Sequence, residues 1–475
     1  MDYLSLIDQN KDEMLKSLQE LIAIKSVAGE REGEYPFGEG VQKAFEYMLT
    51  LGKKEGFRVV NVDNYGGHIE FGSGEEIVGV LGHLDVVPEG SGWDYEPYGG
   101  QIVDGRLYGR GAGDDKGPVM AAFYAMKALK DAGYVPGKRI RLILGLDEET
   151  NWDGMEKYFE KEKKPTLGFT PDADFPAIRG EKGILTFEIA KKLGKSMADG
   201  LELRSLTGGS APNMVADYAR AVLRDTTTYK KGAEPADRYA KVKEIISAYR
   251  HETGHKVNFK GMGKSLEITA AGIPAHGAAP YHGTNAVSIM MELLGRLNFV
   301  NEDVNDFIDF YNQHIGFDSF GERMGCDFCD EPSGKLTFNV GLAAIDQNTA
   351  ELTINIRYPV TSSDDAVYAA MMPVINKYDM GLIKGSHQKP IYFPDGDPMI
   401  ETLMDVYREF TGDVETAPLT IGGGTYARAA ENVVAFGMGF PGDPELAHQK
   451  NEYVLIDNLL KSTKIYAEAL ARLAK

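Results

Sequence analysis

His83 and Asp85 stand directly after the apolar run 77–82, which is typical of a strand covered on both faces. Side chains two positions apart on a strand point to the same side, so the Asp85 carboxylate can lie beside the His83 ring. A metal-binding histidine needs an acceptor for its second ring nitrogen, and a nearby carboxylate is a common one. Open α/β sheets also place ligands at the carboxyl ends of their strands. The pair therefore predicts a metal ligand with a supporting acid.

Two further groups of acids follow a glycine-rich loop and another apolar run. Asp114 and Asp115 lie in the loop 109–117, which holds four glycines in nine residues, and three acids occupy 147–149. Like charges packed together repel one another unless a cation holds them. Either segment alone is compatible with a solvated turn. Three acid-bearing segments at the strand ends and loops of one sheet instead indicate a metal centre.

Helices and strands must position these segments, and the expected elements alternate. Apolar residues at helical spacing predict helices over 11–24 and 39–54, and a third is expected from Pro118 to Ala132. Apolar runs bounded by Asn and Gly predict strands at 57–62, 67–71, 76–82 and 139–146. This alternation is typical of an α/β sandwich.

The texture of the sequence changes over residues 186–385, where Gly, Asn and Ser punctuate short strands and a helix bearing Lys and Glu. The α/β character then returns, with helices expected over about 398–410 and 457–473. The simplest organisation is a catalytic α/β domain of residues 1–185 and 386–475, interrupted by an inserted domain of residues 186–385.

Composition and charge exclude several classes of protein. The net charge is −20, from 71 acidic and 51 basic residues, and such a field disfavours nucleic acid and anionic membranes as partners. The N-terminal residues lack the basic start and apolar run of a signal peptide, and no run of 18 apolar residues predicts a membrane span. Cys326 and Cys329 form one CxxC pair, too few thiolates for a tetrahedral zinc site, and are interpreted as incidental. We expect a cytoplasmic protein.

The ordered motifs between residues 82 and 448 resemble those of peptidase family M20, the zinc-dependent aminoacylase/carboxypeptidase-type metallopeptidases. Within that family, Glu-Glu-Thr-Asn-Trp at 148–152 and Gly-Gly-Gly-Thr-Tyr at 422–426 are most similar to the bacterial PepV-type dipeptidases. The other matching segments are 82–88, Gly92-Trp93, 109–117, Pro171-Asp172, Ala275-His276, 355–359 and Ala447-His448.

The resemblance implies a centre of two zinc ions, for which Mn²⁺ or Co²⁺ are plausible substitutes. Two histidines and three carboxylates are donors that suit Zn²⁺. The resemblance also implies a cis peptide bond between Asp114 and Asp115, with Asp115 outside the ligand set. The implied ligands are Asp114 as the bridge, His83 and Asp172 at one ion, and Glu149 and His448 at the other.

The resemblance assigns catalytic roles as well. Glu148 would be the general base that accepts a proton from metal-activated water, while Asp85 would orient His83. His276, in the inserted domain, would donate a hydrogen bond to the developing oxyanion. The expected reaction is hydrolysis of the peptide bond of dipeptides that have free amino and carboxyl termini.

Further matching positions would bind the substrate. Asn213 and Arg357 correspond to residues that grip the C-terminal carboxylate, a task for which the arginine fork is suited. The backbone amides around Gly423, Gly424 and Thr425 could add donors in a loop of this kind.

The resemblance also implies the fold. It indicates an α/β protein in which a phosphorylase/hydrolase-like α/β/α catalytic domain carries an inserted α+β lid. The lid, 186–385, is about twice as long as family lids that dimerise, so it resembles the duplicated lid of the PepV-type enzymes. In those enzymes the second half of the lid occupies the place of a partner subunit, which favours a monomer.

Two alternatives to a dipeptidase remain open. A deacylase of the same family, acting on N-acyl or N-succinyl amino acids, would share the whole metal site. A catalytically inactive binding protein would keep the fold alone, although the intact Glu148 and ligand positions argue against it.

Overall fold

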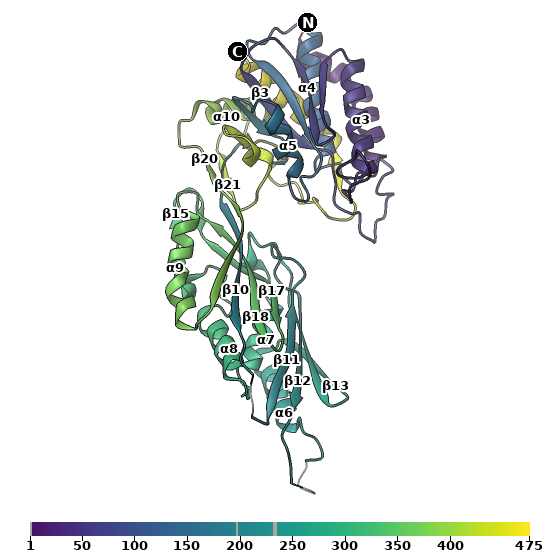
Figure 1. Cartoon of the computed structure of the whole chain (residues 1–475). Helices are drawn as coiled ribbons and strands as arrows, with labels where there is room; N and C mark the ends of the chain where they lie inside the picture. The colour runs from purple at the N-terminus through teal and green to yellow at the C-terminus, as the bar shows by residue number, and fades with distance from the viewer. Residues whose placement is uncertain (1, 196–197, 231–234) are drawn as a thin grey trace. The chain divides into compact units, whose positions relative to one another are not determined.

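The structure is a computed structural model that describes residues 2–195, 198–230 and 235–475, and the chain forms two compact units (Figure 1). Unit 1 comprises Met1–Gly180, Phe393–Thr420 and Gly424–Lys475. Unit 2 comprises Glu181–Tyr392 and Ile421–Gly423. Unit 2 is thus mainly one long insertion into the chain of unit 1.

A nine-stranded sheet forms the centre of unit 1, and its main strands follow the order β1-β2-β6-β3-β7-β22. The central strands β6, β3, β7 and β22 are parallel to their neighbours within this group, whereas β1 and β2 are antiparallel. The bounds are β1 Arg58–Val62, β2 Gly66–Phe71, β3 Ile77–His83, β6 Arg139–Gly145, β7 Leu167–Thr170 and β22 Val433–Ala435. The short strands β9 (Ile178–Glu181), β20 (Ile391–Tyr392) and β21 (Leu419–Ile421) continue the sheet where the chain passes between the units.

Helices cover both faces of this sheet. In β2, Gly67 and the alternate residue Ile69 approach the helix α3, while His68 points the other way and bonds to Tyr158 of α5. Every residue of β3 is buried, as its apolar sequence predicts for a strand covered on both faces. The α/β/α layering is therefore confirmed. The helices of unit 1 are α1 Tyr3–Gln9, α2 Lys11–Ile22, α3 Glu39–Lys54, α4 Lys116–Asp131, α5 Asp153–Lys161, α10 Pro398–Thr411 and α11 Ile456–Leu473.

Unit 2 is built on an eight-stranded antiparallel sheet of order β13-β14-β12-β11-β17-β18-β10-β19. The strands are β10 Gly183–Lys192, β11 Leu201–Gly208, β12 Tyr218–Asp225, β13 Lys256–Met262, β14 Ser265–Ala271, β17 Thr337–Ile345, β18 Thr349–Tyr358 and β19 Gly381–Gln388. The helices are α6 Ala240–Thr253, α7 Ala286–Leu294, α8 Glu302–His314 and α9 Asp364–Lys377. The sheet and helices enclose a separate hydrophobic core.

The two halves of this sheet repeat one arrangement. The half β10-α8-β17-β18-α9-β19 orders its strands second, third, first, fourth across the sheet. The half β12-α6-β13-β14-α7 has the same order when β11 is taken as its fourth strand, although β11 comes first in the chain. Strands β11 and β17 pair to join the halves. The inserted domain is therefore duplicated, as predicted, with one copy permuted.

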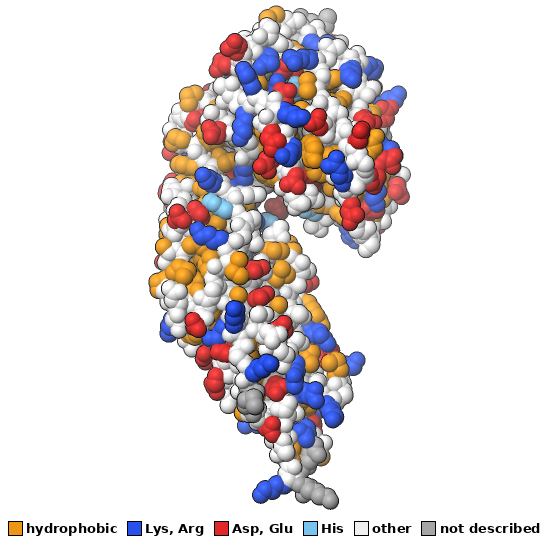
Figure 2. Space-filling view, viewed as in Figure 1, with side chains coloured by type: hydrophobic (Ala, Val, Ile, Leu, Met, Phe, Trp, Pro, Cys, Tyr) orange, Lys and Arg blue, Asp and Glu red, His pale blue; other side chains and the backbone are white. Residues whose placement is uncertain are grey.

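Surface charge, the two cysteines and the hydropathy of the helices complete the description. On the face shown in Figure 2, acidic and basic side chains are interspersed over both units. Cys326 is buried and Cys329 is exposed, and both are free thiols. None of the helices in the described part of the chain is long and apolar enough to cross a membrane.

Candidate metal centre

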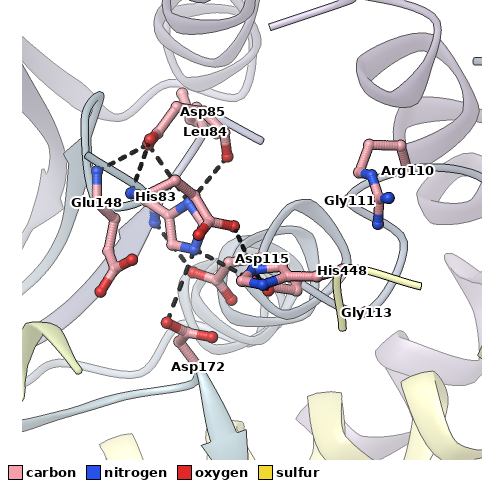
Figure 3. A network of polar contacts seen from close by, with 12 residues as sticks. His83, Leu84, Asp85, Arg110, Gly111, Gly113, Asp115, Glu148, Asp172 and His448 are labelled. Carbon is pink, nitrogen blue, oxygen red and sulfur yellow. Dashed lines mark hydrogen bonds and ion pairs between the residues drawn. The ribbon is translucent and has the colours of Figure 1, made fainter. Parts of the chain in front are cut away.

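The acid-bearing segments of unit 1 meet at one edge of its sheet (Figure 3). His83 is the last residue of β3, Glu148 and Glu149 follow β6, and Asp172 follows β7. These three strands are parallel neighbours, so their carboxyl ends lie at the same edge. Asp114 reaches this edge from the loop that precedes α4.

Asp114 lies between two histidines, with one carboxylate oxygen directed to each. Its Oδ1 is 3.1 Å from Nε2 of His83, and its Oδ2 is 3.2 Å from Nε2 of His448. His83 Nε2 is also 3.7 Å from Asp172 Oδ2, while His448 Nε2 is 2.9 Å from Glu149 Oε1. The structure thus brings all five sequence-predicted ligands together, with Asp114 between the two histidines.

The donor atoms in this cluster fit a metal. The described residues include two overlapping groups whose potential ligand atoms lie within 4.8 Å of one another. Nitrogen and carboxylate oxygen donors of this kind suit Zn²⁺, Mn²⁺ or Co²⁺. The two groups are His83 with Asp114 and Glu149, and His83 with Glu148 and Asp172.

The histidines and carboxylates of this cluster shift one another's pKa values. Hydrogen bonds to Asp114 and Glu149 raise the pKa of His448 to about 10. Burial acts to lower the pKa of His83, but hydrogen bonds to Asp114 and Asp85 raise it well above its usual value. Burial acts to raise the pKa of Asp114, yet His448 and His83 hold it below its usual range. The neighbouring carboxylates therefore favour the protonated form of both imidazoles.

Asp85 connects His83 to the acids after β6. The Nδ1 atom of His83 lies 2.9 Å from the Asp85 backbone oxygen and 3.4 Å from its carboxylate. The two Asp85 carboxylate oxygens accept hydrogen bonds from the backbone N–H groups of Glu148 and Glu149, at 3.1 and 3.0 Å. Asp85 thus contacts the histidine ring mainly through its backbone, because its carboxylate holds the Glu148–Glu149 turn.

Glu148 lies beside this cluster and is only partly accessible. Burial raises the pKa of its carboxyl group well above the usual range, with His83 opposing the shift and Asp172 adding to it. The indole Nε1 of Trp152 donates to the Glu148 backbone oxygen at 2.7 Å. The Glu148 backbone is therefore held at its N–H by Asp85 and at its carbonyl oxygen by Trp152.

Asp114 and Asp115 serve different parts of the site. The peptide bond between them is cis, as predicted from the resemblance. Asp115 is fully buried, and its Oδ2 accepts a hydrogen bond from the His83 backbone N–H at 3.0 Å. Burial, followed by the charge of Asp172, raises the pKa of Asp115 well above its usual range.

An aromatic pair packs behind His83. The Trp152 and Tyr426 rings meet edge to face with centroids 5.0 Å apart, and Tyr426 makes the same kind of contact with His83 at 6.2 Å. Gly145, the last residue of β6, leaves space for the Tyr426 ring, since a Cβ atom at this position would lie 2.2 Å from a Tyr426 ring carbon. The motifs at 148–152 and 422–426 thus pack against each other.

Unit 2 brings several predicted substrate contacts together within itself. Asn213 and His276 are exposed, and their segments join through a bridge between Met214 and His276 and a 2.7 Å bond from the Gly277 N–H to the Asn213 backbone oxygen. The guanidinium of Arg357 is buried and donates to the backbone oxygen of Gly422 at 3.2 Å. Gly422 also lies close to the segment that carries His276. A Cβ atom added to Gly422 would lie 3.1 Å from the Cβ atom of Ala278.

The remaining loop residues divide between the units. Gly423 belongs to unit 2, whereas Gly424 and Thr425 belong to unit 1. The Thr425 hydroxyl accepts a hydrogen bond from the Ala427 N–H at 3.2 Å and caps the short helix Tyr426–Ala429. The contribution expected from this loop is therefore that of its backbone amides.

Two residues with close contacts to the site carry no sequence motif. The Asn339 amide donates to the backbone oxygens of Pro212 and Met214, both at 2.9 Å, and so holds the peptides on either side of Asn213. Glu452 accepts hydrogen bonds from the loop that carries Asp114. Each is an isolated polar residue in the sequence, and only its long-range contacts reveal it.

Comparison with known proteins identifies relatives along nearly the whole chain. The sequence model described as Peptidase family M20/M25/M40 matches residues 79–472. A Bacillus subtilis (strain 168) protein named "Putative dipeptidase YtjP" is 39% identical over 474 residues, covering 98% of both chains. Among solved structures, human carnosine dipeptidase 1 is 18% identical with a TM-score of 0.56, covering 99% of this chain and 98% of that one. The di-peptidase Dug1p of Saccharomyces cerevisiae is 14% identical with a TM-score of 0.57, with the same coverage. The structural likenesses support the fold.

Binding of Zn²⁺ should release protons at neutral pH. The pKa of His448 in the metal-free protein is about 10, and an imidazole must be neutral to bind a metal. Zn²⁺ must therefore displace this proton at any pH below that value, and the apparent affinity should rise as the pH approaches it. Calorimetric titration of Zn²⁺ in two buffers of different ionisation enthalpy measures the release, and we expect about one proton or more per chain.

The His448→Ala variant is the control for this measurement, because it lacks the titrating ring. It should release fewer protons than the wild-type chain. Equal release from both proteins would show that His448 does not bind the metal.

Proposed function

Because the chain belongs to peptidase family M20/M25/M40 and is a hydrolase, we propose that it is a two-zinc dipeptidase acting on dipeptides with free amino and carboxyl termini. The observation that carries the proposal is the placement of Asp114, which directs one oxygen to His83 and the other to His448. The Bacillus subtilis relative is named a putative dipeptidase, and the human and yeast proteins of similar fold are named dipeptidases, which supports the substrate class.

The distances in unit 1 support the proposed ligand sets. Asp114 would be shared, with His83 and Asp172 completing one set and Glu149 and His448 the other. Bound zinc supplies a Lewis acid for the peptide carbonyl and lowers the pKa of a water molecule. The chain's own residues then have to move a proton, stabilise negative charge and hold the substrate.

Glu148 is proposed to move the proton. Burial raises the pKa of the Glu148 carboxyl group, and a raised pKa makes a carboxylate a better proton acceptor. It would take the proton of the attacking water and later transfer it to the leaving amine. Its fixed backbone, held by Asp85 and Trp152, limits where the carboxylate can reach.

Residues of unit 2 are proposed to hold the substrate. His276 would donate to the developing oxyanion, while Arg357 and Asn213 would bind the C-terminal carboxylate, with backbone amides at Gly423 to Thr425 adding donors. The proposal requires residues of both units to act on one substrate molecule. A bound amine at one end and a bound carboxylate at the other would limit the substrate to about two residues. The duplicated sheet further supports the proposal of a monomer.

The substrate class is tested with a panel of dipeptides, tripeptides, tetrapeptides and N-acetyl amino acids, each with Zn²⁺, Mn²⁺ or Co²⁺. We expect dipeptides to have kcat/KM values about 10²-fold or more above those of tetrapeptides and N-acetyl amino acids, because sites built to bind a polar group discriminate strongly against its loss. Preferential cleavage of N-acetyl amino acids would instead identify a deacylase. Metal binding without any turnover would identify a binding protein.

The roles of Glu148 and Glu149 are separated by two matched variants. Glu148→Ala should keep both metals and lose about 10²–10⁴-fold in kcat, because it removes the general base but no ligand. Glu149→Ala should lose activity and, in addition, metal, since it removes a proposed ligand of the ion that His448 would bind. Elemental analysis beside steady-state kinetics measures both effects. The same metal content in the two variants would show that the roles are wrongly assigned.

The role of His276 is tested against a neighbouring histidine. His276→Ala should lower kcat by about 10²–10³-fold with unchanged metal content, the loss expected for one oxyanion donor. His282 is also exposed and lies in the following short helix, so His282→Ala is a matched control that should retain wild-type kcat. An unimpaired His276→Ala enzyme would refute this part of the proposal.

A further inference from the structure

The segment 109–115, which carries Asp114, is rich in glycine. It joins β5 (Arg106–Tyr108) to α4 and contains three glycines, at 109, 111 and 113, of which Gly111 has a φ of 87°. Glycine loses more conformational freedom on folding than other residues, so such a loop needs external partners to keep one conformation. The position of the Asp114 carboxylate depends on those partners.

The Glu452 carboxylate is such a partner, because its two oxygens accept hydrogen bonds from the loop. Its Oε1 accepts hydrogen bonds from the backbone N–H groups of Gly113, at 2.8 Å, and Asp114, at 3.2 Å. Its Oε2 accepts from Arg110 Nη1, at 2.6 Å, and from the Gly111 N–H, at 3.1 Å. Glu452 is 1% exposed, so these bonds form away from water. One side chain therefore holds four donors of the loop, including the amide of Asp114 itself.

Glu452 is itself firmly anchored. Its backbone oxygen accepts from the Gly109 N–H at 3.0 Å, and the adjoining strand β24 (Tyr453–Leu455) pairs with β5. The Arg110 guanidinium lies over the Trp93 ring, 5.3 Å from its centroid. Figure 3 shows Arg110, Gly111 and Gly113 on the loop that leads to the cluster at His448. The pairing of β24 with β5 thus holds Glu452 in place, and the Glu452 carboxylate in turn holds the loop that carries Asp114.

We propose that Glu452 is a positioning residue that sets the metal affinity of the site by fixing the backbone of Asp114. The inference rests on the proposed function, in which Asp114 is the shared ligand. Four donors, one of them the Arg110 guanidinium, converge on the two carboxylate oxygens of Glu452. Loss of residues that orient a ligand typically weakens metal binding by about 10–100-fold. Glu452 follows the ligand His448 by four residues, so one segment would supply both a ligand and the support for another.

The Glu452→Gln variant tests this arrangement with a minimal change in shape. Each carboxylate oxygen accepts two hydrogen bonds, whereas the amide nitrogen of glutamine can only donate. At least two of the four bonds are therefore lost, and a donor faces donors. Glu452→Asp keeps the negative charge opposite Arg110 but shortens the side chain, so it provides a milder second variant.

Glu70 offers a matched control in the same unit. It is also a buried glutamate, 2% exposed, and it accepts from Arg141 Nε at 2.7 Å and from Arg139 at 3.3 Å. It lies in β2 and bonds to none of the proposed ligands among the described residues. Glu70→Gln should therefore perturb folding stability without changing metal affinity.

The experiment measures Zn²⁺ affinity by competition with a chelator, and the absorption spectrum of the Co²⁺-loaded full chain, with circular dichroism as the test of folding. We expect Glu452→Gln to bind Zn²⁺ about 10–100-fold more weakly and to show an altered Co²⁺ spectrum. Glu452→Asp should be intermediate, and Glu70→Gln should match the wild-type chain in both readouts.

The outcomes are distinguishable. A folded Glu452→Gln with wild-type affinity and spectrum would overturn the inference, as would an equal loss of affinity in Glu70→Gln. If Glu452→Gln does not fold, Glu452→Asp decides, and wild-type affinity in that variant would overturn the inference. A wild-type chain that binds no Zn²⁺ would overturn the proposed function and this inference with it.

Discussion

Repulsion among carboxylates at one edge of a sheet is the constraint on which the rest of unit 1 depends. Asp114, Glu149 and Asp172 lie within reach of the same histidine pair, in surroundings that disfavour uncompensated charge. His83 and His448 lie against these carboxylates, and this contact raises the pKa of each imidazole. Divalent cations would supply more charge to the same atoms, so the cluster is best explained as a site prepared for metal.

The surrounding fold answers this constraint with backbone geometry. Parallel strands β6, β3 and β7 deliver their carboxyl ends to one edge, and the Asp85 carboxylate accepts the amides of Glu148 and Glu149 there. Gly145 leaves space for the Tyr426 ring behind His83. The acids are thus held by fixed main-chain donors and packed rings, and their separation does not depend on flexible side chains alone.

The sequence indicates the elements with strong periodicity and the segments rich in acids, because both patterns are local. The fully apolar strand before His83 and the long amphipathic helices lie where their residues predict them. The length of the insertion and the family resemblance indicate the duplication within unit 2. Its permutation is not apparent from the sequence, because β11 precedes the strands it completes. The contacts of Glu452 and Asn339 are also hidden, since each joins segments more than 100 residues apart and neither has a distinctive neighbour in sequence.

The central claim is that one carboxylate, that of Asp114, is shared by two metal ions. Anomalous diffraction at the zinc absorption edge, from crystals of the zinc-loaded chain, tests it most directly. We expect two peaks about 3.5–4 Å apart, one beside His83 and one beside His448, with the Asp114 carboxylate between them. A single peak, or two peaks that do not share Asp114, would contradict this explanation of the site.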